Sequence, residues 1–129
     1  MIDTLYTEFG EVRIFSNFVV AVMNEGVSIK NEYYRVVKNI SEKYYSDKLF
    51  GYISFRKNSY AVDPLVYLKT SKIETLVALA VVSSNGIKST NVELEKRFYA
   101  KPFRHFNNLN DAKTWVYEII AQNENKTTL

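Results

Sequence analysis

The chain has no cysteine, and its 129 residues include one histidine, two prolines and four glycines. The missing cysteines exclude disulfides and thiolate metal sites, and they are typical of a protein from a reducing cytoplasm. A single histidine leaves too few ligands for a zinc site. The four scattered glycines cannot build a Walker loop or a dinucleotide-binding fingerprint. We therefore expect no metal and no cofactor.

The chain also lacks a long apolar run and a block of one charge. The longest apolar stretch, Leu76–Val82, is far shorter than the roughly 20 residues that cross a bilayer. Asp3 and Glu8 stand where a signal peptide would carry basic residues. The 17 basic and 14 acidic residues are mixed along the chain, without the basic stripe that binds phosphates. These features predict a cytoplasmic protein that neither inserts into membranes nor binds nucleic acid.

The composition is that of an ordinary globular domain, with 47% hydrophobic and 24% charged residues. A chain of this length fits one domain and buries roughly two-thirds of the surface that it exposes when unfolded. It contains no visible repeat or linker. We therefore expect a single domain over residues 1–122, followed by a polar tail over residues 123–129.

Alternating and apolar segments predict the strands, at 5–9, 12–15, 18–23, 50–55, 76–82 and 103–106. Ser16 and Asn17 form a turn between the second and third strands, so the chain opens with an antiparallel meander. The uninterrupted apolar runs at 18–23 and 76–82 predict strands that are covered on both faces. Gly51, inside a strand, predicts close packing or a bend.

Helical spacing predicts helices at about 29–45, 64–70 and 90–100, and a last helix that Asn108 caps. Ser28 is the expected cap of the first helix, and Leu94 and Phe98 are expected to share one face of the third. Asp63 and Pro64 mark the start of the short second helix. The order β-β-β-α-β-α-β-α-β-α predicts a single-domain α/β fold with a mixed sheet, parallel at its centre, and helices packed on it.

The end of the chain carries the pattern F-x-x-L-x-x-A-x-x-W, with Phe106, Leu109, Ala112 and Trp115. With the opening meander and the strand in LVALAVVSSN, this pattern resembles the SpoIIAA-like bacterial families of the STAS and Sec14-like fold. The resemblance covers residues 5–121 and rests on element order and apolar pattern. It implies a cytoplasmic, non-enzymatic regulatory or binding domain.

The best-known STAS proteins are anti-sigma-factor antagonists with a phosphorylatable serine in an Asp-Ser-Ser-Gly motif at the start of a helix. The corresponding positions of this chain are Asp63, Pro64, Leu65 and Val66. Asp63 matches the motif, but both serines and the glycine are absent. The resemblance therefore does not imply a phosphorylation switch at this position.

The polar connection after the strand at 50–55 is the best candidate for a partner or ligand surface. Open α/β sheets bind ligands beyond the carboxyl ends of their strands, and the start of the following helix favours an anion. The candidate residues are Arg56, Lys57, Asn58, Ser59, Tyr60 and Asp63. Further positive charge comes from Lys88, Lys96, Arg97, Lys101 and Arg104. These charges either line an anionic-ligand groove, if residues 83–88 end on the same side, or are ordinary solvated charges.

Three functions fit these observations. The first is a regulatory module that binds a protein partner through residues 56–68. The second is a binder of an anionic lipid or metabolite, with a cavity lined by tyrosine and phenylalanine and with Arg56 or Arg104 at its mouth. The third and weakest is an enzyme with His105 as a general base, because no nucleophile or orienting acid is evident in the sequence. Apolar surface on an edge strand or on the last helix would support a homodimer.

Overall fold

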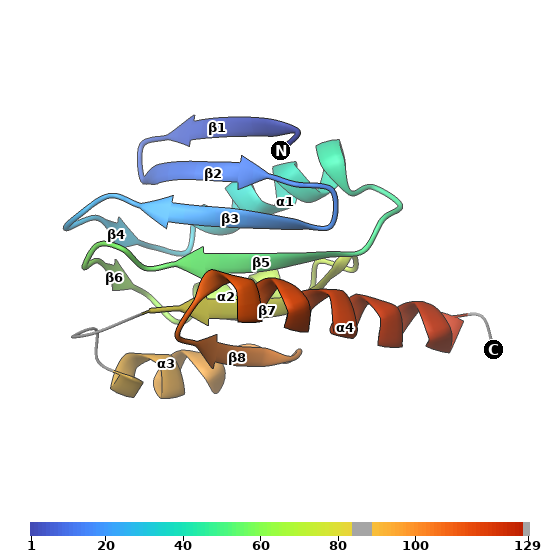
Figure 1. Ribbon diagram of the computed structural model, residues 1–129. Helices are drawn as coiled ribbons and strands as arrows, with labels where there is room; N and C mark the ends of the chain where they lie inside the picture. Colours follow the sequence, from blue (N-terminus) through green and yellow to red (C-terminus); the bar gives the residue numbers. More distant parts are fainter. Residues whose placement is uncertain (84–88, 128–129) are drawn as a thin grey trace.

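The computed structural model describes residues 1–83 and 89–127, and its centre is a six-stranded sheet in the order β1-β2-β3-β5-β7-β8 (Figure 1). The strands are β1 (Asp3–Thr7), β2 (Gly10–Ile14), β3 (Phe18–Met23), β5 (Phe50–Phe55), β7 (Leu76–Val82) and β8 (Phe103–Phe106). The first three pair antiparallel, and β3, β5, β7 and β8 run parallel. The predicted mixed sheet, with an antiparallel meander that leads into a parallel centre, is confirmed.

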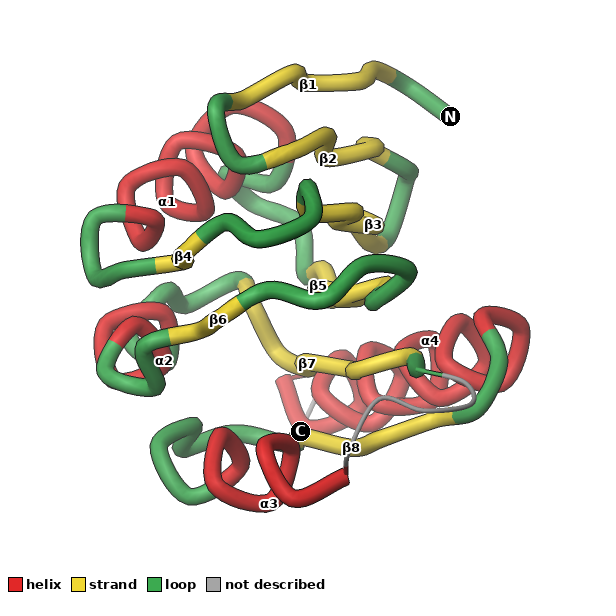
Figure 2. The backbone as a smooth tube through the Cα atoms, turned by 90° about the vertical axis from the view of Figure 1, so that its left-hand side faces the viewer, coloured by secondary structure: helices red, strands yellow, loops and turns green. Residues whose placement is uncertain are grey.

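Helices cover both faces of this sheet. They are α1 (Tyr33–Tyr44), α2 (Val66–Thr70), α3 (Ser89–Lys96) and α4 (Leu109–Thr127). Figure 2 shows α1, α2 and α3 on one face and α4 on the other, against β5, β7 and β8. The core is accordingly divided into one cluster of buried side chains on each face. Every residue of β7 is buried, as its uninterrupted apolar run predicts.

The first helix begins later than its sequence pattern indicates. Ser28–Ile29 form a short strand, β4, which pairs in parallel with β6 (Ala61–Val62). Asp63 donates its backbone N–H to the carbonyl of Ile29, and this bond holds Ile29 in an extended segment. The predictions that the helix starts at Ile29 and that Ser28 caps it are therefore wrong, and α1 starts at Tyr33 without a side-chain cap.

The short helices α2 and α3 also depart from expectation. Asp63 accepts the N–H of Leu65 in the turn that leads to α2, which begins at Val66. Helix α3 ends at Lys96, where residues up to 100 were expected to be helical. Val92 and Glu95 form its buried side, whereas Leu94 is 49% exposed. The prediction that Leu94 and Phe98 share one face of this helix is wrong, because Phe98 lies beyond its end and is half-buried.

The last helix confirms its predicted cap. Asn108 accepts the N–H of Asp111 at 2.9 Å and donates its own amide to the Asp111 carboxylate. Ala112, Val116 and Ile120 are buried against the sheet. The helix continues to Thr127, so most of the expected tail from residue 123 onward is helical.

Helix α4 approaches the sheet most closely at Gly51. A Cβ atom at this position would overlap with Cγ1 of Val116 and lie 3.0 Å from Cγ2. The pairing of β5 with β7 also shifts register between Phe50 and Gly51. Gly51 therefore provides both the close packing and the local irregularity that its position in a strand predicts.

Candidate functional site

The parallel strands bring three polar side chains to one edge of the sheet. Arg56 follows β5 and Ser83 follows β7, while His105 lies in β8. The backbone N–H of Arg56 donates to Val82 O at 2.8 Å, and that of Ser83 donates to Phe106 O at 3.1 Å. These bonds continue the strand ladders by one residue and fix both positions beside the carboxyl ends of the strands.

Arg56 is buried in an ion pair with Glu95 of α3. The two residues are 8% and 4% exposed. The guanidinium donates from Nη1 to Oε2 of Glu95 at 2.8 Å and from Nη2 to Oε1, which is a bidentate arrangement. The Tyr67 hydroxyl of α2 donates to the same carboxylate. Arg56 is thus not the surface charge expected from its place in a polar connection, and an internal carboxylate already neutralises it.

The protonation states of this cluster follow from burial and from its bonds. Burial alone would lower the pKa of Arg56, but hydrogen bonding to Glu95, together with the electrostatic effects of Tyr60, Tyr67 and Glu95, more than offsets this and raises the pKa above its ordinary value. Burial, together with the nearby Glu95 carboxylate, also holds the pKa of Tyr67 well above its ordinary value. The cluster therefore keeps a protonated guanidinium and a protonated phenol around one carboxylate.

Three neighbours of Arg56 in the predicted surface lie nearer the solvent. Lys57 is exposed, with its ammonium 4.9 Å from the ring centre of Phe55. Asn58 is half-buried and donates its amide to the carbonyl of Met23. Ser59 is exposed and donates its backbone N–H to Glu25. The side chain of Asn58 therefore holds the connection in place, whereas those of Lys57 and Ser59 face solvent.

Tyr60 and Asp63 complete the predicted set. Tyr60 is half-buried, its hydroxyl is 2.8 Å from Ser54 Oγ, and its ring lies 5.6 Å from the Arg56 guanidinium. Asp63 is half-buried in the turn before α2, where it accepts the N–H of Leu65. Tyr60 therefore belongs to the wall around the ion pair, whereas Asp63 belongs to the turn before α2.

A shallow groove of about 170 Å³ opens beside the ion pair. Its lining consists of Arg56, Tyr60, Ala61, Val62, Pro64, Leu94 and Glu95. Leu94, which lines the groove, is exposed on α3, and Leu65, which follows the groove residue Pro64 in the chain, is exposed at the start of α2. Leu68, one turn further along α2, is also exposed. We call Pro64, Leu65, Leu68 and Leu94 the α2–α3 surface. This apolar surface borders the groove, in which the charges of Arg56 and Glu95 neutralise each other.

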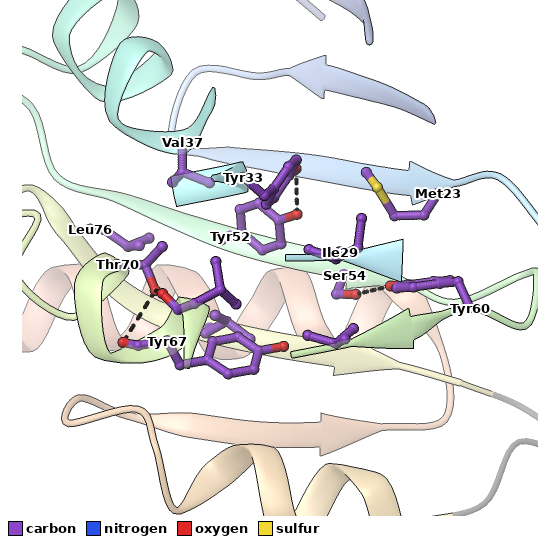
Figure 3. A pocket seen from close by; sticks show the side chains of 13 residues that line it. Met23, Ile29, Tyr33, Val37, Tyr52, Ser54, Tyr60, Tyr67, Thr70 and Leu76 are labelled. Carbon is purple, nitrogen blue, oxygen red and sulfur yellow. Dashed lines mark hydrogen bonds between the residues drawn. The ribbon is translucent and has the colours of Figure 1, made fainter. Parts of the chain in front are cut away.

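A second cavity lies inside the core, between the sheet and the helices α1 and α2 (Figure 3). Its polar lining includes the hydroxyls of Tyr33 and Tyr52, 2.8 Å apart, and the Ser54–Tyr60 pair. Its volume is about 30 Å³, which accommodates one or two water molecules. The predicted metabolite cavity, with phenylalanine in its lining and Arg56 or Arg104 at its mouth, does not correspond to this space, because none of these residues lines it.

The additional basic residues do not gather around Arg56. Lys101 donates its ammonium to the carbonyls of Ile73 and Leu76, each at 2.6 Å. Arg104 is exposed and lies 5.1 Å from the ring centre of Phe106, in a hollow beside α4. Lys96 and Arg97 are exposed, and Lys88 lies outside the described residues. Those of these basic residues that the structure describes are therefore either solvated or bound to backbone carbonyls.

His105 has a partner that the sequence analysis did not find. Its Nε2 atom lies 2.6 Å from the hydroxyl of Ser83, which is buried. A serine next to a histidine is the start of a nucleophilic pair, which also needs a third group to orient the histidine. Within residues 1–83 and 92–123, no carboxylate is hydrogen-bonded to His105. The pair therefore joins the ends of β7 and β8 without the third member of a triad.

Two important residues, Glu95 and Ser83, were missed because their partners are distant in the sequence. The only local signal for Glu95 is its place three residues after Val92, on the inward side of a helix.

The described residues contain no group of three or more histidine, aspartate or glutamate side chains placed to hold a metal ion. No helix in the described part of the chain combines the length and apolar character needed to cross a membrane.

Together the sheet order and the site define the class of the protein: a mixed α/β domain with a paired-charge groove at the carboxyl ends of its parallel strands. Comparisons of the chain with protein-family models, with curated proteins and with solved structures found no match.

Proposed function

We propose that this protein is a STAS/SpoIIAA-like, non-enzymatic regulatory module that binds a protein partner through the α2–α3 surface. The opening meander, the parallel centre and the helix after β5 support this likeness. Pro64 and Leu65 stand where the phosphorylatable motif of the anti-sigma-factor antagonists would lie. Binding of the partner at this position is therefore constitutive and does not depend on phosphorylation of these residues.

The observation that carries the proposal is the exposure of three leucines beside a groove whose charges are already paired. Leu65, Leu68 and Leu94 project into solvent from two short helices. Apolar side chains grouped at a groove are typical of protein-binding surfaces. A small-molecule site usually has a volume of about 300–1,000 Å³, which exceeds both the groove and the inner cavity. The sizes of these two spaces thus argue against a metabolite site in either of them.

The charges around the α2–α3 surface indicate the chemistry of the partner. Lys96, the last residue of α3, and Arg97, which follows it, are exposed. On α3, Glu93 is an exposed acidic residue. We infer that the partner presents an apolar segment flanked by acidic residues, because such a segment fits both the leucines and the basic rim.

A photo-crosslinking amino acid at Leu94 is expected to capture this partner in cells of the protein's own source, whereas the same amino acid at Tyr117 is not. Tyr117 is a matched control, because it is also 49% exposed but lies on α4, on the opposite face of the sheet. Mass spectrometry identifies the captured protein. With the purified partner, Leu94→Asp should weaken binding by roughly tenfold or more, because a central apolar contact contributes about 2 kcal/mol.

Tyr117→Asp should leave the affinity for the same partner unchanged. Capture of the same proteins from both positions, or equal affinities for the wild type and Leu94→Asp, would contradict the assignment of the α2–α3 surface. Circular dichroism and thermal unfolding of each variant separate a loss of binding from a loss of fold.

The Ser83–His105 pair is the one observation that favours an enzyme. We expect a fluorophosphonate probe, which labels activated serines, to leave Ser83 unmodified, because the side chain is buried and no carboxylate within residues 1–83 and 92–123 is hydrogen-bonded to His105. Intact-protein mass spectrometry measures the labelling. Stoichiometric labelling of Ser83 that is lost in His105→Ala would overturn the non-enzymatic proposal.

A further inference from the structure

Strand β1 is an open edge of the sheet and carries exposed apolar side chains. In Figure 1 it lies at the top of the sheet, and β2 is its only neighbour in the strand order. Tyr6 is 84% exposed, and Ile2 next to the strand is also exposed. An edge strand presents unpaired backbone N–H and C=O groups that can pair with another strand.

The usual devices that protect an edge are missing from β1. The strand contains no lysine and no proline, and its pairing with β2 runs from Asp3 to Thr7 without a register shift. Its single charged residue, Asp3, accepts hydrogen bonds from the Tyr44 hydroxyl of α1 and from the backbone N–H of Thr4, so it occupies one outward donor of the edge. The opposite edge differs, because β8 has only four residues, carries the exposed Arg104, and contacts α3.

The outward backbone groups of β1 can be identified. The N–H of Thr4 donates to the carboxylate of Asp3 at 2.8 Å and so points away from the ladder with β2. Backbone groups alternate between the two sides of an antiparallel strand. Thr4 and Tyr6 therefore present their N–H and C=O groups to solvent, whereas Leu5 presents its groups to β2.

We propose that β1 pairs antiparallel with β1 of a second copy of this chain, on a two-fold axis at Leu5. Thr4 of each copy then lies opposite Tyr6 of the other, and Asp3 lies opposite Thr7. The Thr4 N–H exchanges its bond to the Asp3 carboxylate for one to the Tyr6 carbonyl of the second copy, and the Tyr6 N–H of that copy donates to the Thr4 carbonyl. This register places no like charges opposite one another, so the strand is complementary to itself. The two six-stranded sheets become one continuous sheet.

The chain's lack of cysteine makes the register directly testable. The two Leu5 residues form a non-hydrogen-bonded pair with Cα atoms about 4.5 Å apart, within the range that a disulfide bridges. Leu5→Cys is expected to yield a disulfide-linked dimer under mild oxidation. Tyr6→Cys is the matched control, because the two Tyr6 positions are diagonal neighbours about 7–8 Å apart and should remain unlinked.

The wild-type protein should have twice the chain mass of 15.0 kDa by light scattering. Thr4→Pro should be monomeric and folded, because proline removes an outward N–H and is tolerated in an edge strand. A monomeric wild type at micromolar concentration would overturn the proposal. So would a wild-type dimer that Thr4→Pro leaves intact, or one in which Tyr6→Cys links as readily as Leu5→Cys.

Discussion

Glu95→Ala is expected to lower the free energy of unfolding by about 3–5 kcal/mol, because it leaves a buried arginine without its counter-charge. Arg56 donates two hydrogen bonds to Glu95, and Tyr67 donates a third. Removal of the carboxylate leaves a buried guanidinium with only its long hydrogen bonds to Ser54 and Tyr67. Helix α3 also loses its buried ionic contact with the segment after β5. Chemical denaturation monitored by circular dichroism measures the change.

Two controls separate the buried pair from charge removal in general. The Glu11–Arg13 pair is 3.0 Å long with both side chains about a third exposed, so Glu11→Ala should cost under about 1 kcal/mol. The double variant Arg56→Met/Glu95→Leu should be more stable than Glu95→Ala, because it removes both charges and keeps the volume. Equal losses for Glu95→Ala and Glu11→Ala would show that the Arg56 cluster is more hydrated than its burial indicates.

Gly51→Ala is expected to lower the free energy of unfolding by about 1–3 kcal/mol, because its methyl group would overlap with Val116. Val116 is fully buried and branched at Cβ, so it cannot rotate away freely. The strand and α4 must therefore separate locally to accommodate the methyl group. Thermal or denaturant unfolding of the purified variant measures the cost.

A double-mutant cycle identifies the cause of this loss. In Gly51→Ala/Val116→Ala the new methyl group occupies space that the valine vacates, so the double variant should be more stable than the sum of the single effects predicts. Additive effects would mean that Gly51 is required for the register shift of β5 and not for the approach of α4.

The strands could be predicted from the sequence because their apolar patterns are local. The run Phe18–Met23 and the run Leu76–Val82 are continuous, and the structure confirms both bounds. The start of α1 was misplaced because Ile29 continues the helical spacing of Tyr33. Ile29 instead pairs with Val62, a tertiary contact that a local sequence pattern does not predict.

The candidate site was predictable only in its position. The segment after β5 does reach the carboxyl edge of the sheet, as its place in the chain indicates. The burial of Arg56 depends on Glu95, which is 39 residues away in the sequence, and His105 meets Ser83 across 22 residues. Such pairs depend on how the helices pack, so a sequence pattern shows the charges but not which of them neutralise each other.

The strand order brings together neighbours of two kinds, and this affects how the chain folds. Strands β1, β2 and β3 are joined by tight turns, so their pairing closes only short loops. The pairing of Val20 in β3 with Ile53 in β5, by contrast, closes a loop that contains all of α1. Loop closure costs conformational entropy before the distant contacts compensate for it, and this cost slows the folding of parallel sheets. The meander can therefore assemble as a local unit, whereas the pairing of β5 with β3 and of β7 with β5 requires the closure of longer loops.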